Sequence, residues 1–180
     1  MPDHLSSILF TPRLKLRPFV DSDLPFVFQG LSHPDVIKYY AVNFKSLEDT
    51  KEQMEWFKIL EETQTGQWWA VCSKEGSVCY GAGGINDWNH EHQKAEIGFW
   101  LLPAYWGNGY MKEAMNAIVD HCFNVFNIHR IEGFVESNNT NCKRGLSKLG
   151  FQHEGTLVDC EKKNGVFISL DVFAMVKEEN

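Results

Sequence analysis

The sequence lacks several features that would place it in a common class of protein. Its 180 residues contain no apolar stretch of about 20 residues, the length that a membrane-spanning helix needs. The opening segment Met1–Phe10 holds a proline, an aspartate and a histidine instead of the apolar run of a secretory signal. Basic residues are also few, since 17 Lys and Arg stand against 24 Asp and Glu, a formal net charge of −7. Without a Lys/Arg-rich stripe, we expect binding neither to nucleic acid nor to a membrane.

The cysteines predict neither a disulfide framework nor a zinc site. Their number is odd and no C-x-x-C pair occurs, so we expect free thiols in the reducing cytoplasm. His90 and His92 flank Glu91, but no H-E-x-x-H motif is present, and a solvent-exposed turn is the simpler interpretation. We therefore expect no metal. The five cysteines are Cys72, Cys79, Cys122, Cys142 and Cys160.

Hydrophobic periodicity predicts a mixed α/β fold, and the length of the chain, with no repeat or linker, predicts a single domain over residues 1–180. Three consecutive strands joined by short connections indicate an antiparallel meander. Apolar residues at steps of three and four from Met111 to Phe126 predict an amphipathic helix. The expected strands are Arg13–Phe19, Gln67–Ser73, Val78–Ile85, Ala95–Leu102, Arg130–Val135, Leu157–Glu161 and Val166–Val176, and the other helices run through Phe26–Leu31, Leu47–Leu60 and Thr140–Leu149.

Two glycines precede the amphipathic helix, in the segment Gly107-Asn108-Gly109-Tyr110. Glycine lets the backbone approach a ligand, and the free N–H groups of a first helical turn suit a pyrophosphate. An ordinary tight turn would explain the spacing equally well. Competing phosphate motifs fail, because no Lys-Ser/Thr follows Gly109 and Lys112 stands where a dinucleotide fingerprint needs a third glycine. The other cluster, Gly81–Gly84, indicates a thin strand with close backbone approach.

Several segments occur in order along the chain at compatible spacing. They are Thr11–Phe19, Glu96–Pro103 (EIGFWLLP), Tyr105–Met111 (YWGNGYM), Asn139–Cys142 and Lys148–Gly155 (KLGFQHEG). Together they resemble the GNAT superfamily of acetyltransferases, and within it the RimJ/RimL branch, the ribosomal-protein N-terminal acetyltransferases. The resemblance covers roughly residues 9–177. It implies a GNAT fold: a central mixed, largely antiparallel sheet flanked by helices, in which two neighbouring strands splay apart and acetyl-CoA enters the V.

The resemblance also assigns residues to acetyl-CoA. Leu101, with Leu102 beside it, falls where a family backbone N–H holds the thioester carbonyl. Asn139 matches an asparagine that contacts the CoA arm. Trp106 departs from the Arg or Gln of the wider superfamily, but Trp is usual in this branch and the contacts of the loop are mainly made by backbone. The pyrophosphate loop covers Gly107, Asn108, Gly109, Tyr110, Met111 and Lys112.

Transfer to an amine needs a base, because only the free amine attacks a thioester, and a proton donor for the leaving thiolate. Glu161 matches a proposed base of the branch and is the first candidate. Glu96, at the start of the strand expected to line the splay, is the second. For both, a solvated strand-end carboxylate is the ordinary alternative. Cys142 replaces the Ser of the family pattern Asn-x-x-Ser, and it is either a thiol donor or a small packing residue at a helix start.

These features predict an acetyl-CoA-dependent N-acetyltransferase. The resemblance favours a protein or peptide N-terminal amine as acceptor, such as a basic protein tail. Two alternatives stay open: a small amine (a polyamine, an aminoglycoside or an amino acid), and a non-catalytic acyl-CoA-binding module, which the substitution at Cys142 would suit. We expect acceptor specificity to come from Leu24–Thr63 and the final hairpin. Homodimers are common in this branch, so the resemblance is also compatible with a homodimer.

Overall fold

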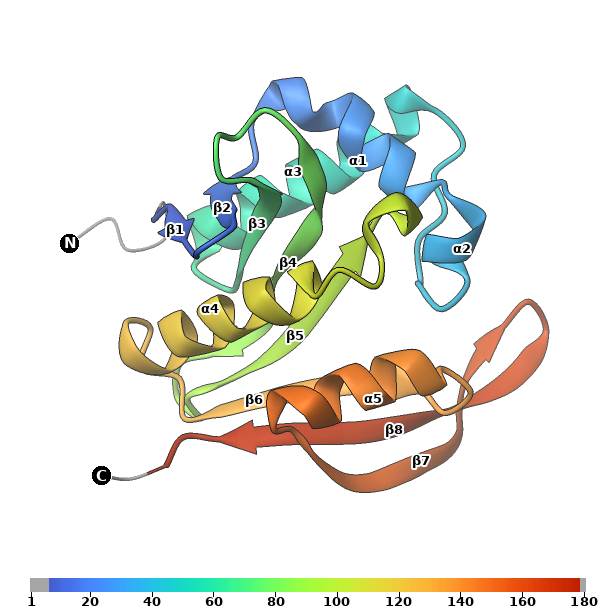
Figure 1. The fold of residues 1–180 in the computed structure, drawn as a ribbon. Coiled ribbons are helices and arrows are strands. Elements are labelled where there is room, and N and C mark those ends of the chain that lie inside the picture. Colours follow the sequence, from blue (N-terminus) through green and yellow to red (C-terminus); the bar gives the residue numbers. More distant parts are fainter. Residues whose placement is uncertain (1–6, 179–180) are drawn as a thin grey trace.

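The computed structural model describes residues 7–178 and places eight strands in one sheet with helices on both faces (Figure 1). The first six residues of Met1–Phe10, where no secretory signal is expected, lie outside the described residues. The strands are β1 (Leu9–Phe10), β2 (Leu14–Pro18), β3 (Gln67–Ser73), β4 (Cys79–Asn89), β5 (Lys94–Leu101), β6 (Arg130–Glu136), β7 (Gln152–Lys163) and β8 (Val166–Val176). The helices are α1 (Leu24–Leu31), α2 (Pro34–Ile37), α3 (Leu47–Thr63), α4 (Tyr110–Asn124) and α5 (Thr140–Leu149), with 3-10 turns at Asp21–Asp23 and Pro103–Tyr105.

The predicted mixed α/β fold is confirmed. The sheet has the order β1-β2-β3-β4-β5-β6-β8-β7, and every neighbouring pair is antiparallel except β5 and β6, which run parallel. The predicted meander is the β3–β4–β5 part of this order. Sequence analysis missed β1 and α2, and it placed the start of β7 at Leu157, whereas the strand begins at Gln152. Between these elements, His90 and His92 lie in an exposed turn, as predicted.

The predicted splay lies between the two parallel strands. Lys94–Glu96 of β5 pairs with Arg130–Glu132 of β6, and among the described residues this pairing goes no further. Beyond Glu96, β5 stays bonded to β4 up to Leu101, while β6 stays bonded to β8 up to Glu136. The two strands therefore separate without leaving the sheet.

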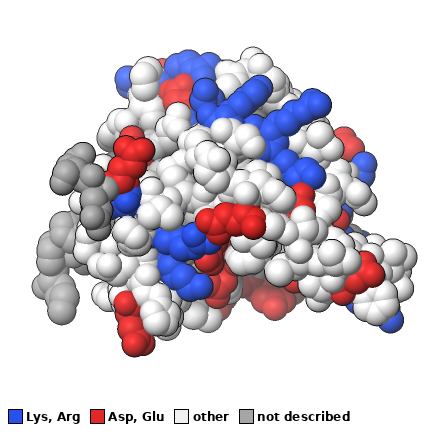
Figure 2. Space-filling model, turned by 90° about the horizontal axis from the view of Figure 1, so that it is seen from below, with Lys and Arg blue, Asp and Glu red and all other residues white. Residues whose placement is uncertain are grey.

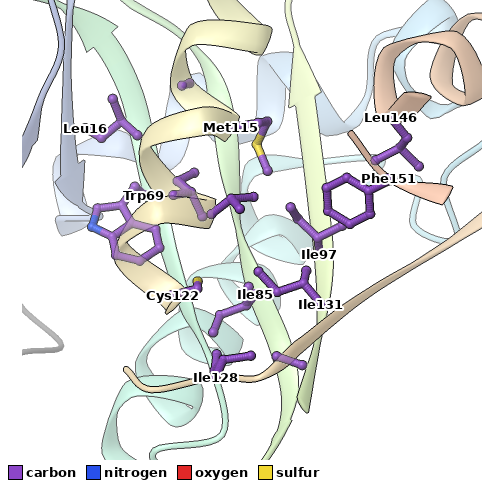
Figure 3. Packing of buried hydrophobic residues seen from close by; sticks show 14 of the residues in the cluster. Leu16, Trp69, Ile85, Ile97, Met115, Cys122, Ile128, Ile131, Leu146 and Phe151 are labelled. Atoms are coloured by element: carbon purple, nitrogen blue, oxygen red, sulfur yellow. The ribbon is translucent and has the colours of Figure 1, made fainter. Parts of the chain in front are cut away.

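Apolar side chains fill both faces of the sheet. On one face, α4 and α5 cover the larger cluster (Figure 3): Met115 and Cys122 of α4 pack over Trp69 and Ile85, and Leu146 of α5 joins the same cluster. On the other face, α1 and α3 pack on the sheet around Trp68 and Trp100. The splay opens between these two layers, so a molecule in it can be reached from both sides of the sheet.

Local capping explains where α3 begins and where α5 begins and ends. The Ser46 hydroxyl accepts a hydrogen bond from the Asp49 N–H at 3.1 Å at the start of α3. The Asn139 side chain accepts one from the Cys142 N–H at 3.2 Å at the start of α5. Helix α5 ends at Gly150, whose φ of +100° lies in the left-handed region that favours glycine. All three signals are readable in the sequence.

The expectation that all five cysteines are free thiols is wrong for one pair. Cys72 and Cys79 form a disulfide across the β3–β4 hairpin, where the two residues stand opposite each other in the register. The signal that could have found this pair is their position on either side of the short connection between the predicted strands Gln67–Ser73 and Val78–Ile85. Cys122, Cys142 and Cys160 are free.

The charge, hydropathy and metal-ligating side chains of the described residues add three observations. Acidic side chains lie beside the basic ones on the face shown in Figure 2. Arg130, for example, is paired with both Glu132 and Glu154. Within residues 7–178, no helix is both long and apolar enough to cross a bilayer, and no group of three or more His, Cys, Asp or Glu side chains could hold a metal ion.

The glycines of β4 allow the meander to pack closely, as the sequence indicates. A Cβ atom added to Gly84 would collide with the carbonyl oxygen of Gln67 and the Cα atom of Trp68, both in the backbone of β3. A backbone collision is relieved only by moving a strand. The pairing of β3 with β4 therefore depends on glycine at this position.

We expect Gly84→Ala to lower the free energy of unfolding by roughly 1–3 kcal/mol, the usual effect of overpacking. Urea denaturation followed by tryptophan fluorescence measures this change. Gly145→Ala is the matched control: it lies inside α5, its added Cβ meets nothing within 4 Å, and it should stabilise the fold by about 0.5–1 kcal/mol because alanine favours a helix. Equal stability of Gly84→Ala and wild type would contradict the close packing of β3 on β4.

Candidate functional site

A continuous cleft of about 1,370 Å³ runs through the splay. It extends from the loop before α4 and the start of α5 to the segment after α2 and the side of α3. The structure therefore brings most of the sequence-predicted site residues to one cavity. Those that line it are Glu96, Leu101, Gly107, Gly109, Tyr110, Met111, Lys112, Asn139, Cys142 and Glu161, whereas Leu102 and Asn108 are not among the lining residues.

Leu102 and Asn108 have structural partners instead. Leu102 is buried, and its N–H donates to the Tyr80 carbonyl at 2.8 Å in continuation of the β4–β5 pairing. The side-chain amide of Asn108 donates to the carbonyls of Tyr105 and Trp106, each at 3.1 Å. Asn108 thus closes the turn that its neighbouring glycines form.

The loop before α4 takes its shape from its two glycines. Gly107 and Gly109 have φ of +78° and +77°, a left-handed conformation that side chains other than glycine rarely adopt. Gly109 is the N-cap of α4, so the N–H groups that follow it have no acceptor within the helix. These donors, with the positive end of the helix dipole, are suited to an anion such as a pyrophosphate.

Arg13, which sequence analysis did not assign to the site, supports this loop. Its guanidinium donates to the Asn108 carbonyl at 2.9 Å, forms an ion pair with Glu113 of α4 at 2.6 Å, and lies 4.7 Å from the centre of the Tyr110 ring. Tyr110 in turn stacks on Tyr80 of β4. Arg13 lies about one hundred positions from these partners, and no local pattern in the sequence could have connected them.

The backbone of β5 has one edge directed into the cleft. The bond from the Leu102 N–H to the Tyr80 carbonyl fixes which residues pair with β4. Because alternate residues of an antiparallel strand point to opposite sides, Phe99 and Leu101 turn their N–H and C=O groups away from β4. Two side chains bond these carbonyls: the Tyr40 hydroxyl donates to Phe99 O at 3.1 Å, and the indole N–H of Trp106 donates to Leu101 O at 2.7 Å. The Leu101 N–H thus has the direction that its predicted role requires.

Glu96 lies half-buried where β5 and β6 part. Burial raises the pKa of its carboxyl to about 7, and the negative charges of Asp87, Glu132 and Glu161 add to the increase. Glu161, from β7, is exposed and lines the same cleft. The two carboxylates predicted from the sequence are therefore near neighbours with different surroundings.

Cys142 lies at the start of α5 and also lines the cleft. Burial raises the pKa of its thiol to about 11, so the group stays protonated at neutral pH. Asn139 caps the helix through its Oδ1 atom, which bonds the Cys142 N–H. Its predicted contact with the CoA arm would therefore fall to the other side-chain atom, Nδ2.

A buried carboxylate fixes α5 and the last hairpin against each other. Asp171 of β8 accepts hydrogen bonds from Lys143 at 2.8 Å, Ser137 at 3.1 Å and Thr156 at 2.6 Å. The bond with Lys143, followed by that with Thr156, lowers the pKa of Asp171 to about 2. Because Lys143 adjoins Cys142 in α5, this network determines how Cys142 is placed relative to the hairpin that carries Glu161.

The other end of the cleft is aromatic and acidic. Trp56 and Trp68 stand edge to face with ring centres 5.9 Å apart, and Phe44 lies on the same wall. Acidic residues are more numerous than lysines along the whole lining: Asp35, Glu52, Glu55, Glu96, Glu136 and Glu161 against Lys112, Lys162 and Lys163. Aromatic faces and carboxylates together attract cations.

Known proteins are similar to this chain over most of its length. The family model "Acetyltransferase (GNAT) domain" matches residues 13–152. The chain is 31% identical over 171 residues to the uncharacterized N-acetyltransferase YoaA of Bacillus subtilis, covering 94% of this chain and 97% of the relative. It is 27% identical over 149 residues to spermidine N(1)-acetyltransferase of Escherichia coli, covering 81% of this chain and 76% of the relative.

A solved structure has the same fold. It is that of RimL, described as the ribosomal L7/L12 alpha-N-protein acetyltransferase in complex with coenzyme A, and it superposes with a TM-score of 0.85 at 19% identity, covering 94% of this chain and 98% of the other. Acetyl-CoA is the co-substrate of such acetyltransferases. The free backbone donors at the start of α4 and along β5 suit its pyrophosphate and its carbonyl groups.

We expect Gly109→Val to weaken binding of CoA by roughly 5- to 30-fold, because a left-handed residue with a side chain costs about 1–2 kcal/mol. Isothermal titration calorimetry with CoA measures the affinity, and the melting temperature reports whether the variant is folded. Gly155→Val is the control, since Gly155 lies in β7 with no atom within 4 Å of an added Cβ. Unchanged affinity in a folded Gly109→Val protein would place the pyrophosphate elsewhere.

Proposed function

The chain belongs to the GNAT acetyltransferase family, and we propose that the amine it acetylates belongs to a cationic acceptor, in the first place the N-terminus of a basic peptide or protein. We also propose that the whole chain forms a single acetyltransferase domain. One observation carries it: the cleft joins a glycine loop suited to pyrophosphate with an aromatic and acidic end suited to a cation. The amine and the thioester would then meet between these ends, at the splay.

The acidic end also favours a second candidate acceptor, a polyamine. A flexible chain with several ammonium groups can place one amine at the splay while the others contact carboxylates such as Asp35, Glu52 and Glu55, which lie on the lining. The similarity to spermidine N(1)-acetyltransferase is consistent with this acceptor. A basic peptide has the same charges on a larger scaffold, so the two candidates differ in size rather than in chemistry.

For the general base we propose Glu96, ahead of Glu161, which the sequence alone places first. A base acts best when its pKa lies near the working pH, and burial brings the pKa of Glu96 to about 7. Glu161 is exposed, and its negative charge contributes to the raised pKa of Glu96. In this scheme Glu161 assists by keeping Glu96 basic. Its own role as base stays a prediction that the variants below test.

For the proton donor we propose Cys142. The amine transfers a proton to Glu96 as its nitrogen forms a bond with the acyl carbon. When the carbon–sulfur bond breaks, the electron pair remains on the sulfur of CoA. The Cys142 thiol, which stays protonated because its pKa is about 11, donates its proton to that sulfur, and solvent then returns a proton to the Cys142 thiolate. A thiol is a weaker donor than the Ser of the family pattern.

An acceptor screen tests the proposed function. Release of free CoA from acetyl-CoA is followed with spermidine, spermine, an aminoglycoside, neutral amino acids, and peptides with Ser, Ala or Met N-termini in basic and acidic versions. We expect turnover with the basic peptides or the polyamines and little with the acidic peptides. Preference for an acidic or neutral acceptor would contradict the cationic substrate class. No turnover with any amine, despite tight binding of acetyl-CoA, would favour a non-catalytic acyl-CoA-binding protein.

We expect the rate of the wild-type enzyme to rise with pH and to level off above about 7, as Glu96 loses its proton. Glu96→Gln should lower kcat by roughly 10²- to 10⁴-fold, the usual contribution of a general base, and should abolish the inflection. Glu161→Gln removes a charge that raises the pKa of Glu96, so it should move the inflection to lower pH and retain the plateau. The opposite pattern, with Glu161→Gln inactive and Glu96→Gln active, would assign the base to Glu161.

The same raised pKa has a consequence for stability that does not depend on the acceptor. A carboxyl whose pKa is about 7 when folded and 4.5 as a free side chain holds its proton in the folded state between these pH values, where the unfolded chain has lost it. The contribution of Glu96 to stability therefore falls as pH rises through this window. In Glu96→Gln this fall should be absent, as measured by urea denaturation between pH 4.5 and 8.

A further inference from the structure

Tyr40 joins the two layers of the molecule at the splay. It follows α2, and its ring packs against the aromatic cluster under α1 and α3. Its hydroxyl donates a hydrogen bond to the Phe99 carbonyl of β5, 59 positions along the chain, at 3.1 Å. Both residues line the cleft. The contact therefore lies at the point where the aromatic and acidic end of the cleft meets the free edge of the splayed strand.

This contact changes what the free edge offers to a ligand. An unpaired strand edge normally presents alternating N–H donors and C=O acceptors. Two carbonyls on the side of β5 that faces the cleft are bonded, Phe99 O by Tyr40 and Leu101 O by Trp106. The N–H groups of Phe99 and Leu101 point to the same side, and β6 does not reach them among the described residues. The edge that remains consists mainly of donors.

A donor edge suits a carbonyl oxygen, and above all one that gains negative charge. When an amine adds to a thioester, the negative charge develops on the carbonyl oxygen, and preorganised N–H donors stabilise it most. Free carbonyl oxygens pointing into the same space would repel that charge. Covering the Phe99 carbonyl removes one such oxygen and holds the N–H groups beside it in place.

We propose that Tyr40 is a positioning residue for acyl transfer: by bonding the Phe99 carbonyl, it keeps the N–H groups on the free edge of β5 directed at the thioester carbonyl of acetyl-CoA. The inference rests on the proposed function only in that acetyl-CoA lies in the splay, whichever amine is the acceptor. The Tyr40 hydroxyl keeps its proton and so remains a donor. Burial, followed by the nearby Cys142 and Glu96, raises its pKa.

The test uses Tyr40→Phe and acetyl-CoA labelled with ¹³C at the acetyl carbonyl. Hydrogen bonds to a carbonyl oxygen lower its stretching frequency, so the infrared band of the bound thioester reports directly on the donors around it. We expect wild type to shift the band below its position in water-free solvent, and Tyr40→Phe to lose part of that shift. In the acceptor assay we expect kcat to fall by roughly 2- to 10-fold, the equivalent of one neutral hydrogen bond, with little change in KM for acetyl-CoA.

Tyr39→Phe is the matched control. Tyr39 is the preceding residue, lines the same cleft, and bonds the Asn138 carbonyl through a longer contact of 3.5 Å outside β5. It should leave the infrared band unchanged. Calorimetry with CoA, which has no thioester, separates positioning from folding: for Tyr40→Phe the CoA affinity and the melting temperature should stay near those of wild type.

Three results would overturn the proposal. One is an unchanged infrared band in Tyr40→Phe. The second is an equal loss of affinity for CoA and acetyl-CoA, or failure of the variant to fold, either of which would make Tyr40 a structural residue only. The third is a fall in kcat with an unchanged band, which would assign the hydroxyl to another step. Because the spectra need no acceptor, they can succeed even where the amine screen fails, and the two proposals fail separately.

Discussion

The parallel pairing of β5 with β6 ends at Glu96, and the rest of the site depends on that ending. Each strand keeps its other neighbour, so the sheet holds while the two strands part. Backbone groups left unpaired in a dry interior cost about 1–3 kcal/mol each, and such an edge persists only where side chains, water or a ligand satisfy it. Tyr40 and Trp106 bond two of its carbonyls. The remaining N–H groups are what makes this gap a place for a carbonyl substrate.

The two ends of the cleft differ in electrical character, and this difference suits two substrates of opposite charge. The positive end of the α4 dipole, with Lys112 on the lining, suits a pyrophosphate. The end beside α3 carries carboxylates and aromatic faces and suits a cation. Glu96 lies between them, where burial and three neighbouring acids keep its pKa near 7. A base of this strength can take the proton that the amine loses as its nitrogen bonds the acyl carbon.

Local signals in the sequence were sufficient for most of the elements. Ser46, Asn139 and Gly150 mark helix ends because capping depends on residues within a few positions of one another. The motifs likewise located the glycine loop, Cys142 and both glutamates. Arg13 and Tyr40 could not be found in this way, since their partners lie about one hundred and 59 positions away. The disulfide of Cys72 and Cys79 was missed because counting cysteines ignores which of them face each other across a hairpin.

The sequence also could not predict which N–H groups of β5 face the cleft. The reason involves the glycines of β4. Which N–H groups face the cleft depends on the register of β5 against β4, where Gly83 stands opposite Phe99 and Gly81 opposite Leu101. A slip of one residue would turn the N–H groups of Phe99 and Leu101 towards β4 and point those of their neighbours into the splay. A Cβ atom added to Gly81 would collide with the Trp100 carbonyl oxygen and the Leu101 Cα atom, so a side chain there would displace β5. Residues that look like a thin, featureless strand in the sequence therefore help to set which N–H groups of β5 face the cleft.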